Sequence, residues 1–318
     1  MSKFGLNYDR RFMLLKVENG DPSAAPGKTY ENMHIMAFPL GSLFLPSISF
    51  PKDDQDEGSI TVTFNTSTEE KPRSITIPLR PSTSGLEIID VNMHKSPTKA
   101  YNMGHYSNSW FSSCFGFEVV LAYLGEHSRA VLMSTTTPSN ASWLSSIQNR
   151  IPFLDSKREE NRITFADCAP LLIVTEESLD NASSRMSNGE KFDITKFRPN
   201  IVISGAAEAW EEDFWGELDI ANSVTIQLPQ SCNRCKSINV DYGTGQYGTG
   251  EAGSMLKKLQ KDRRVDKGAK YSPVFGRYGF PRGTEGHISV GDAVIVKKRT
   301  SERSVFGKLN RDMICCMR

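Results

Sequence analysis

Residues 231–244 read Ser-Cys-Asn-Arg-Cys-Lys-Ser-Ile-Asn-Val-Asp-Tyr-Gly-Thr, and this stretch combines reactive side chains with a clear local pattern. Cys232 and Cys235 lie three positions apart and flank Arg234. The alternation after them predicts a strand, and residues 242–245 (Tyr-Gly-Thr-Gly) predict the turn that closes it. A thiolate is a strong ligand for transition metals, and a neighbouring cation favours the ionised thiol. These two cysteines are therefore the first candidates for chemistry.

The cysteine pair alone leaves three interpretations open. A structural zinc site needs a second pair of ligands, which only Cys315 and Cys316 could supply. A redox pair needs a helix to begin at the motif after a strand, whereas here a strand is predicted to follow it. Two buried thiols without a role are the third interpretation.

Arginines beside apolar strands give a second signal. Arg10, Arg11 and Arg198 each adjoin such a strand, and Pro199 and Asn200 follow Arg198. A guanidinium fork suits phosphate or a polar heterocycle, although a solvated surface arginine is the common alternative. The chain has no lysine-bearing phosphate loop and no GxSxG motif, and its five histidines are scattered. Residues 243–248 (Gly-Thr-Gly-Gln-Tyr-Gly) resemble a glycine-rich phosphate loop, but no strand-to-helix context supports one.

The overall composition excludes several classes of protein. The chain has 318 residues and a net charge of +1, which argues against a dedicated nucleic-acid binder. Six cysteines in a chain of this length do not make a disulfide scaffold. No apolar run approaches the roughly 20 residues that span a bilayer, and no secretory signal opens the chain. We expect a cytoplasmic protein with free thiols whose sequence begins inside a domain.

The patterns predict a β-rich, mixed α/β fold in two domains. An N-terminal β-rich domain is expected over residues 1–134, a linker over 135–160, a second domain over 161–298 and a disordered tail over 299–318. Strands of the first domain are predicted at 12–17, 42–50, 59–64 and 75–79. A helix from residue 110 to 115, continuing to 124, follows them.

The second domain alternates strands and helices. Thr175 is predicted to cap a helix over 176–186, which follows a buried strand at 171–174. Its further elements are expected as strands at 201–205 and 223–228, a helix at 253–263, and two short strands within 287–297. A strand at 130–133 is expected at the end of the first domain.

Six stretches together resemble the molybdenum cofactor sulfurase C-terminal (MOSC) superfamily, and within it the mitochondrial amidoxime reducing component in its fungal form. Their order and spacing cover nearly the whole chain, and the Arg-Pro-Asn and Cys-x-x-Cys signatures are specific in combination. The stretches are residues 9–14, 165–172, 197–203, 232–245, 272–276 and 290–292.

The resemblance implies a MOSC β-barrel with helices, an N-terminal β-barrel-like domain and a molybdopterin cofactor between them. It implies that Cys235 is the molybdenum ligand, with Cys232 as its neighbour. It also implies that Arg11, Arg198 and Asn200 hold the pterin and its phosphate. Asp167, Cys168 and Ala169 match a cofactor-facing loop, in which family members often carry hydroxyls at the last two positions.

The function implied is reduction of N-hydroxylated compounds such as amidoximes and hydroxylamines. Electrons would come from a b-type cytochrome and its flavin-dependent reductase. Two alternatives remain: a cofactor-handling or sulfur-transfer module, although no pyridoxal-phosphate sulfurase domain accompanies it, and a degenerate member without activity. Family members usually begin with a membrane anchor and a Lys-Ser-containing segment, often at the mitochondrial outer membrane, and we expect this sequence to start after both.

Overall fold

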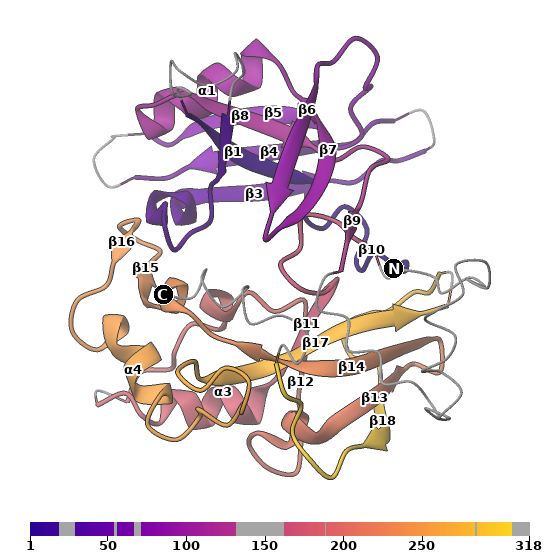
Figure 1. Cartoon of the computed structure of the whole chain (residues 1–318), viewed down its shortest axis with the longest axis vertical. Helices are drawn as coiled ribbons and strands as arrows, with labels where there is room; N and C mark the ends of the chain where they lie inside the picture. The colour runs from indigo at the N-terminus through magenta and orange to yellow at the C-terminus, as the bar shows by residue number, and fades with distance from the viewer. Residues whose placement is uncertain are drawn as a thin grey trace, which may run out of the picture.

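The computed structural model describes residues 1–18, 29–53, 56–66, 71–131, 162–187, 189–283 and 285–306. The N-terminal strands and helix α1 fill the upper half of Figure 1, and the C-terminal sheet with α3 and α4 fills the lower half. The β-rich, mixed α/β fold class is confirmed. No described helix is long and apolar enough to cross a membrane.

The described residues from 1 to 123 form two antiparallel sheets and one α-helix. The first sheet has the strand order β2-β1-β8-β7-β6, and the second has the order β3-β4-β5. Alternating side chains of β4 and β5 are buried, as the sequence pattern predicted. The elements are β1 (Phe12–Glu18), β2 (Thr29–Asn32), η1 (Pro39–Leu43), β3 (Phe44–Ser49), β4 (Ser59–Phe64), β5 (Arg73–Pro78), β6 (Ile88–Met93), β7 (Ser96–Asn102), α1 (His105–Phe115) and β8 (Val119–Tyr123).

The predicted continuation of the helix to residue 124 is wrong. Helix α1 ends at Gly116, which has the left-handed φ of 79° and donates its N–H to Ser112 O. The next residues form β8, where Val119 and Val120 are buried and pair with β1. Glycine stops the helix, and β-branched residues then favour the extended backbone.

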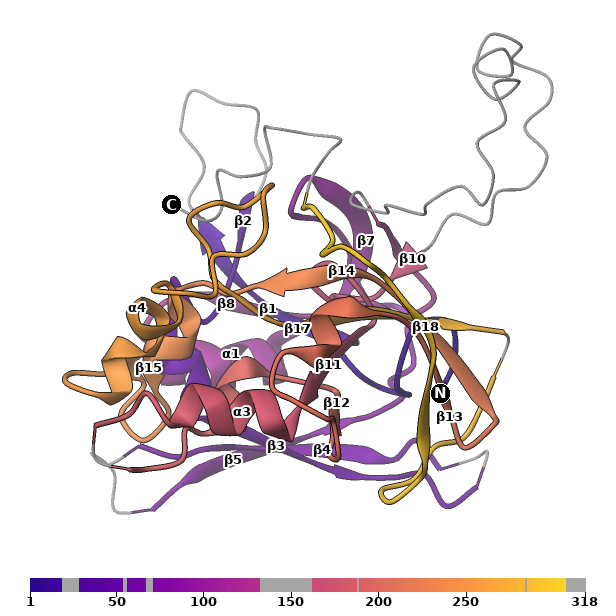
Figure 2. The same ribbon diagram turned by 90° about the horizontal axis from the view of Figure 1, so that it is seen from below.

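The C-terminal half is organised around one six-stranded, curled sheet with the order β12-β11-β17-β14-β13-β18. Thr175 caps α3 as predicted, accepting a 3.2 Å hydrogen bond from Ser178 N. Helices α3 and α4 lie beside each other on one side of this sheet (Figure 2). The elements are β11 (Leu171–Thr175), α3 (Glu176–Ser183), β12 (Ile201–Ile203), β13 (Trp215–Ile220), β14 (Val224–Asn233), α4 (Met255–Leu259), β17 (Val274–Arg282) and β18 (Val294–Arg299).

Three predictions for the C-terminal half need correction. Both helices are shorter than expected, because α3 ends at Ser183 and α4 spans five residues after a 3-10 turn. Residues 287–297 contribute one named strand, β18, instead of two. Residues 299–306 are not a disordered tail: Arg299 ends β18, and the side chain of Phe306 is buried at 6% exposure.

Some expectations fall outside the described residues. These are the linker at 135–160, most of the strand at 130–133 and residues 307–318. Residues 129–130 and 162–163 form the short pair β9 (Arg129–Ala130) and β10 (Arg162–Ile163). The division into two domains at 134 and 161 stays a prediction.

Gly276 allows β17 to approach β11 closely. It has a φ of +82°, and a Cβ at this position would lie 2.7 Å from Ile173 O. We expect Gly276→Ala to lower the free energy of unfolding by about 2 kcal/mol, measured by urea denaturation, because backbone strain and overpacking combine. Gly85→Ala is the control, since its φ of +77° is similar but nothing lies within 4 Å of its Cβ position. Equal losses in both variants would contradict the close-approach argument.

Candidate functional site

A small cavity of about 90 Å³ collects most of the residues that the sequence singled out. Four of its lining segments lie far apart in the chain: Arg10 before β1, the loop before β11, the turn after η2 (Ile194–Phe197), and the end of β14. Of the predicted site residues, the lining includes Asp167, Arg198, Asn200, Cys232 and Cys235. Arg11 and Cys168 are not part of it.

The two cysteines occupy different environments. Cys232 is the second-to-last residue of strand β14 and is only 2% exposed. Its sulfur accepts a hydrogen bond from Arg234 Nη1 at 3.0 Å. Cys235 is half-buried, and its Sγ lies 3.2 Å from Ser237 Oγ. The more accessible thiol of the pair is therefore Cys235.

The predicted strand after the motif is present but short, as β15 (Val240–Asp241), and the predicted turn follows it, with Thr244 N donating to Asp241 O. Strand β14 runs into the motif and ends at Asn233, and residues Lys236–Asn239 form the 3-10 turn η4 between the two strands. The motif thus leads into a 3-10 turn and a strand, and not into the helix that a redox pair needs. The zinc alternative depended on Cys315 and Cys316, which lie outside the described residues, and within the described ranges no three His, Cys, Asp or Glu side chains are grouped to bind a metal.

Arg234 is a buried cation whose neighbours are sulfur atoms. Its Nη2 donates to Phe197 O at 2.9 Å, and the guanidinium also lies over the Phe197 ring. Its Nε has no hydrogen-bond partner among the described residues. Burial lowers the pKa of Arg234, but negative charge on Cys232, Tyr278 and Cys235 outweighs burial and raises it. The guanidinium thus places positive charge beside the Cys232 sulfur.

Arg10 occupies the place expected for Arg11. The guanidinium of Arg11 donates to Gly125 O instead. Arg10 forms an ion pair with Asp9 and also donates to Asn200 Oδ1 at 3.4 Å. The turn before β1 explains why Arg10, and not Arg11, lines the cavity. Arg10 has a left-handed φ of 50°, and β1 begins only at Phe12.

Asn200 acts as a connector between distant segments. Its Oδ1 accepts from Leu172 N at 2.9 Å, and its Nδ2 donates to Asp9 Oδ2 at 2.9 Å. The Asp9 carboxylate in turn pairs with Arg10. Both halves of the Asn200 amide are therefore engaged within the protein, and the residue positions Arg10 at the cavity.

Arg198 and Asp167 place opposite charges at the cavity. Arg198 ends η2 with a left-handed φ of 56°, and its guanidinium is exposed and makes no ion pair or hydrogen bond among the described residues. Desolvation opposes ionisation of Asp167, but His94 at 3.6 Å and the charges of Arg198 and Arg10 hold its pKa below the usual range. Asp167 is thus an exposed anion near the guanidinium groups of Arg198 and Arg10.

Tyr278 and Cys168 complete the surroundings of Cys232. Tyr278 lies on β17 and lines the cavity, and burial, followed by the charges of Cys168 and Cys232, raises its pKa. Burial, followed by the charge of Asp167, raises the pKa of Cys168, which makes Cys168 a neutral thiol at pH 7. No sequence pattern marked Tyr278, since an isolated tyrosine in a buried strand is ordinary.

Arg129 holds the loop that carries Asp167. It is 1% exposed and donates to Thr164 O at 3.0 Å, Met93 O at 3.1 Å and Asp167 O at 3.2 Å, with a further bond to Ala166 O. A buried arginine that satisfies carbonyls fixes the backbone of the loop. No sequence pattern pointed to this role.

Removing the Arg129 guanidinium should destabilise the protein through these carbonyls. We expect Arg129→Met to lower the free energy of unfolding by about 2–4 kcal/mol and to speed amide exchange in residues 164–167, because buried acceptors lose their donors. Arg162→Met is the matched control, since Arg162 is exposed. A loss below about 0.5 kcal/mol for Arg129→Met would contradict the structural role.

A family model covers most of the C-terminal half. Residues 160–295 match the family model of the MOSC domain. This matched region is similar to a MOSC domain. Asp167, Arg198, Asn200, both cysteines and Tyr278 fall inside it, whereas Arg10 comes from the segment before it.

Curated relatives extend the similarity. The chain is 38% identical over 144 residues to "Mitochondrial amidoxime-reducing component 1" of Homo sapiens, covering 44% of this chain and 40% of that protein. It is 32% identical over 197 residues to "Mitochondrial amidoxime reducing component 2" of Macaca fascicularis, covering 62% of this chain and 52% of that protein. The chain thus spans about half the length, or less, of the curated relatives it matches.

A second kind of relative is similar to a shorter segment of this chain. The "Molybdenum cofactor sulfurase" of Oryza sativa subsp. japonica is 33% identical over 94 residues, which are 27% of this chain and 11% of that protein. Both kinds of relative are connected by name with amidoxime reduction or the molybdenum cofactor. The chain is thus similar, over part of its length, to molybdenum-cofactor-related proteins.

Proposed function

We propose that this protein is a molybdenum-cofactor-dependent oxidoreductase that reduces N-hydroxylated compounds such as amidoximes and hydroxylamines. The observation that carries the proposal is the half-buried Cys235 thiol on a cavity next to two guanidinium groups without carboxylate partners among the described residues, Arg198 and Arg234. A thiol ligand and surplus positive charge are what an anionic metal–pterin phosphate requires.

The donor set fits this cofactor. Cys235 would bind the metal, and Arg10 and Arg198 would contact anionic groups of the cofactor. Asn200 would act through Arg10, since its amide is already used within the protein. Asp167 and Cys168 belong to the loop that Arg129 fixes, which favours backbone contacts from this loop.

The cavity volume limits what can enter. At about 90 Å³ it has room for a metal and its immediate ligands, and the pterin body would lie outside it. Cys232 and Arg234 form the inner wall, where the guanidinium keeps positive charge next to both sulfurs. When bound, the cofactor supplies the two-electron redox chemistry, and the protein supplies binding, orientation and electrostatics.

The overall reaction consumes two electrons and two protons, breaks the N–O bond and releases water. We assign the electrons to a b-type cytochrome and its flavin-dependent reductase. The names of the relatives support the substrate class.

The test uses the full chain purified from a host that makes the molybdenum cofactor. We expect close to one molybdenum and one pterin per chain, by mass spectrometry and by fluorescence of the oxidised pterin. We also expect benzamidoxime reduction that depends on NADH, the reductase and the cytochrome. Protein without metal and pterin would overturn the proposal, and bound cofactor without turnover would favour the cofactor-handling function of the sulfurase relative.

A further inference from the structure

The pairing of β14 with β17 becomes irregular at the cysteine motif. Ser231 lies opposite Arg277, and two residues further along β14, Asn233 lies opposite Val274, three residues back along β17. An irregularity of this kind interrupts the ladder of backbone hydrogen bonds, and it is common next to active sites. Because the ladder is interrupted where the turn from Cys232 to Cys235 begins, the position of this turn depends on other contacts.

The chain after β18 returns to the motif and supplies one of these contacts. We call residues 303–306 the strap. The register of β13 with β14 ends at Gln227, and further along β14 the N–H of Ser231 donates to Ser304 Oγ of the strap at 2.8 Å. Arg277 Nη1 donates to the same oxygen at 3.1 Å. Ser231 is only 1% exposed, so water cannot replace the strap as its acceptor.

A buried carboxylate, Asp266, joins the strap to the residue that follows Cys232. Its Oδ2 accepts from Asn233 Nδ2 at 3.2 Å, and its Oδ1 accepts from Phe306 N at 2.9 Å. The same Oδ1 accepts from Gly268 N at 2.8 Å, and a Cβ on Gly268 would lie 1.9 Å from Phe306 O. Asp266 therefore connects the cysteine motif, the loop before β17 and the strap.

The strap is fixed at both of its ends. At its start, Arg303 Nε donates to the fully buried Asp213 carboxylate at 2.8 Å, and the Arg303 guanidinium lies over the Phe214 ring. At its end, the side chain of Phe306 is buried. Ser304, between these two ends, is therefore held beside the cysteine motif.

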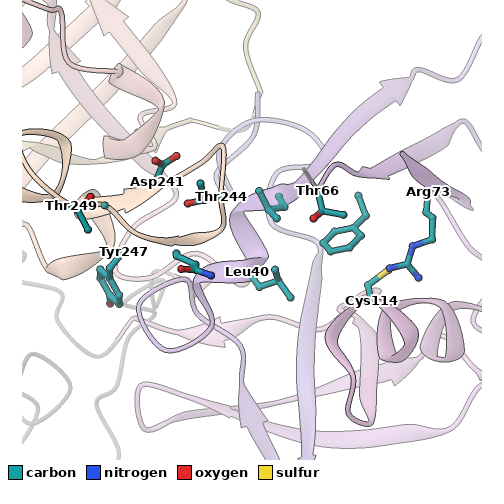
Figure 3. A pocket seen from close by; sticks show the side chains of 12 residues that line it. Leu40, Thr66, Arg73, Cys114, Asp241, Thr244, Tyr247 and Thr249 are labelled. Atoms are coloured by element: carbon teal, nitrogen blue, oxygen red, sulfur yellow. The ribbon is translucent and has the colours of Figure 1, made fainter. Parts of the chain in front are cut away.

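The chain after the motif is held by the N-terminal half. The turn η4 leads from Cys235 to the hairpin of β15 and β16 (Gln246–Tyr247). Tyr247 donates its hydroxyl proton to Met36 O at 2.7 Å. Figure 3 shows this hairpin, which carries Tyr247, next to the N-terminal segment that carries Leu40. The cysteine turn therefore has one anchor on each side, the strap before it and the hairpin after it.

We propose that Ser304 and Asp266 are positioning residues, which hold the turn from Cys232 to Cys235 in the shape that presents the Cys235 sulfur to the cavity. The inference rests on the proposed function and adds the residues that keep the metal-binding thiol in place. Neither side chain is among those that line the cavity, so both act through the backbone and side chain of the motif. Without their contacts the turn would open more often, and a metal held by Cys235 would be released faster.

Two variants remove the two contacts separately. Ser304→Ala takes the acceptor from a buried N–H, and Ser304→Thr, which keeps the hydroxyl, is the rescue variant. In Asp266→Asn the Oδ1 atom can still accept from Phe306 N, but an amide donor now faces the Asn233 donor. Ser301→Ala, at an exposed position shortly before the strap, is the control.

Three measurements follow the turn. In cofactor-free full-length protein, peptide mass spectrometry gives the rate at which iodoacetamide alkylates Cys232, which lies between the two residues that the strap and Asp266 hold. Amide hydrogen exchange in β11 reports whether the rest of the C-terminal half has loosened. In protein loaded with cofactor, the third measurement is the rate of molybdenum release to a chelator.

We expect Ser304→Ala and Asp266→Asn to raise the alkylation rate of Cys232 at least about tenfold, because a buried donor or acceptor loses its partner. Molybdenum release should also rise at least about tenfold, as it does when support of a metal ligand is lost. Exchange in β11 should change much less. Ser304→Thr and Ser301→Ala should match the wild type in all three measurements.

Three results would overturn the inference. The first is wild-type alkylation in the two test variants, and Asp266→Asn decides alone if Ser304→Ala does not fold. The second is an equal increase at Cys232 and in β11, because the whole half would then have loosened. The third is faster alkylation with unchanged molybdenum release, because motion of the turn would then not affect the metal.

Failure of the proposed function gives a different result. Protein that never binds molybdenum would contradict the proposed function. Its Cys232 alkylation would still show whether Ser304 and Asp266 hold the turn, because that measurement needs no cofactor.

Discussion

Cys235→Ser should remain folded, lose nearly all bound molybdenum and reduce benzamidoxime at least about 100-fold more slowly than the wild type. Removing a side chain that only supports a metal ligand already lowers metal affinity or activity by about 10–100-fold. Removing the ligand itself should therefore lower them by at least about 100-fold. Serine has nearly the same volume, so the half-buried position should tolerate it. Metal content per chain and the reductase rate measure the two effects.

The matched control lies in the same motif. Cys232→Ser keeps an acceptor for Arg234 Nη1, which donates to this sulfur at 3.0 Å, and should retain most of the molybdenum. Loss of metal from Cys232→Ser, with retention by Cys235→Ser, would reverse the two assignments. Unfolding temperatures of both variants show whether a loss comes from the site or from the fold.

Asp213→Ala should lower the free energy of unfolding by about 3–5 kcal/mol, because it leaves buried positive charge without a partner. The Asp213 carboxylate is fully buried and accepts two hydrogen bonds from Arg263 Nη2 at 2.9 Å each and one from Arg303 Nε at 2.8 Å. Arg263 is 3% exposed, so water cannot replace the lost carboxylate. Urea denaturation should show a lower midpoint with an unchanged slope.

The exposed ion pair of Asp180 with Lys191 is the comparison for Asp213. Its atoms lie 2.9 Å apart, but both side chains are at least 60% exposed. Asp180→Ala should lower the free energy of unfolding by less than about 1 kcal/mol, since water solvates the remaining ammonium of Lys191. If Asp213→Ala cost no more than Asp180→Ala, burial of the pair would not be the source of its stability.

Local patterns predicted most secondary structure because each strand or helix carried its own signal. Alternation marked β4, and Thr175 marked the start of α3. The errors arose where one residue overruled a longer pattern. Gly116 ended a helix whose apolar spacing continued, and the tail near Arg303 and Phe306 is ordered by distant partners that no local pattern reveals.

The candidate site was predicted in its residue types more than in its geometry. The Cys-x-x-Cys spacing marked Cys232 and Cys235, an adjoining strand marked Arg198, and all three line the cavity. The choice between Arg10 and Arg11 depends on a turn that neighbouring residues do not encode. Arg129 lies deep in the structure, and its bonds to loop carbonyls depend entirely on tertiary packing.

The Asn200 connector has a consequence for the order of folding. It joins Asp9 and Leu172, and its bond to Asp9 closes a loop of 191 residues. Such a contact forms late, because closing a long loop costs conformational entropy, and only the formed contact offsets this cost. Arg10 is therefore brought to the cysteines only after both halves have folded and docked. A chain that folds one half, or docks the halves wrongly, has an incomplete set of cations and cannot hold an anionic group tightly. The amount of bound cofactor per chain would then measure how many molecules have completed folding. In a cell, the cofactor would bind only to correctly assembled molecules.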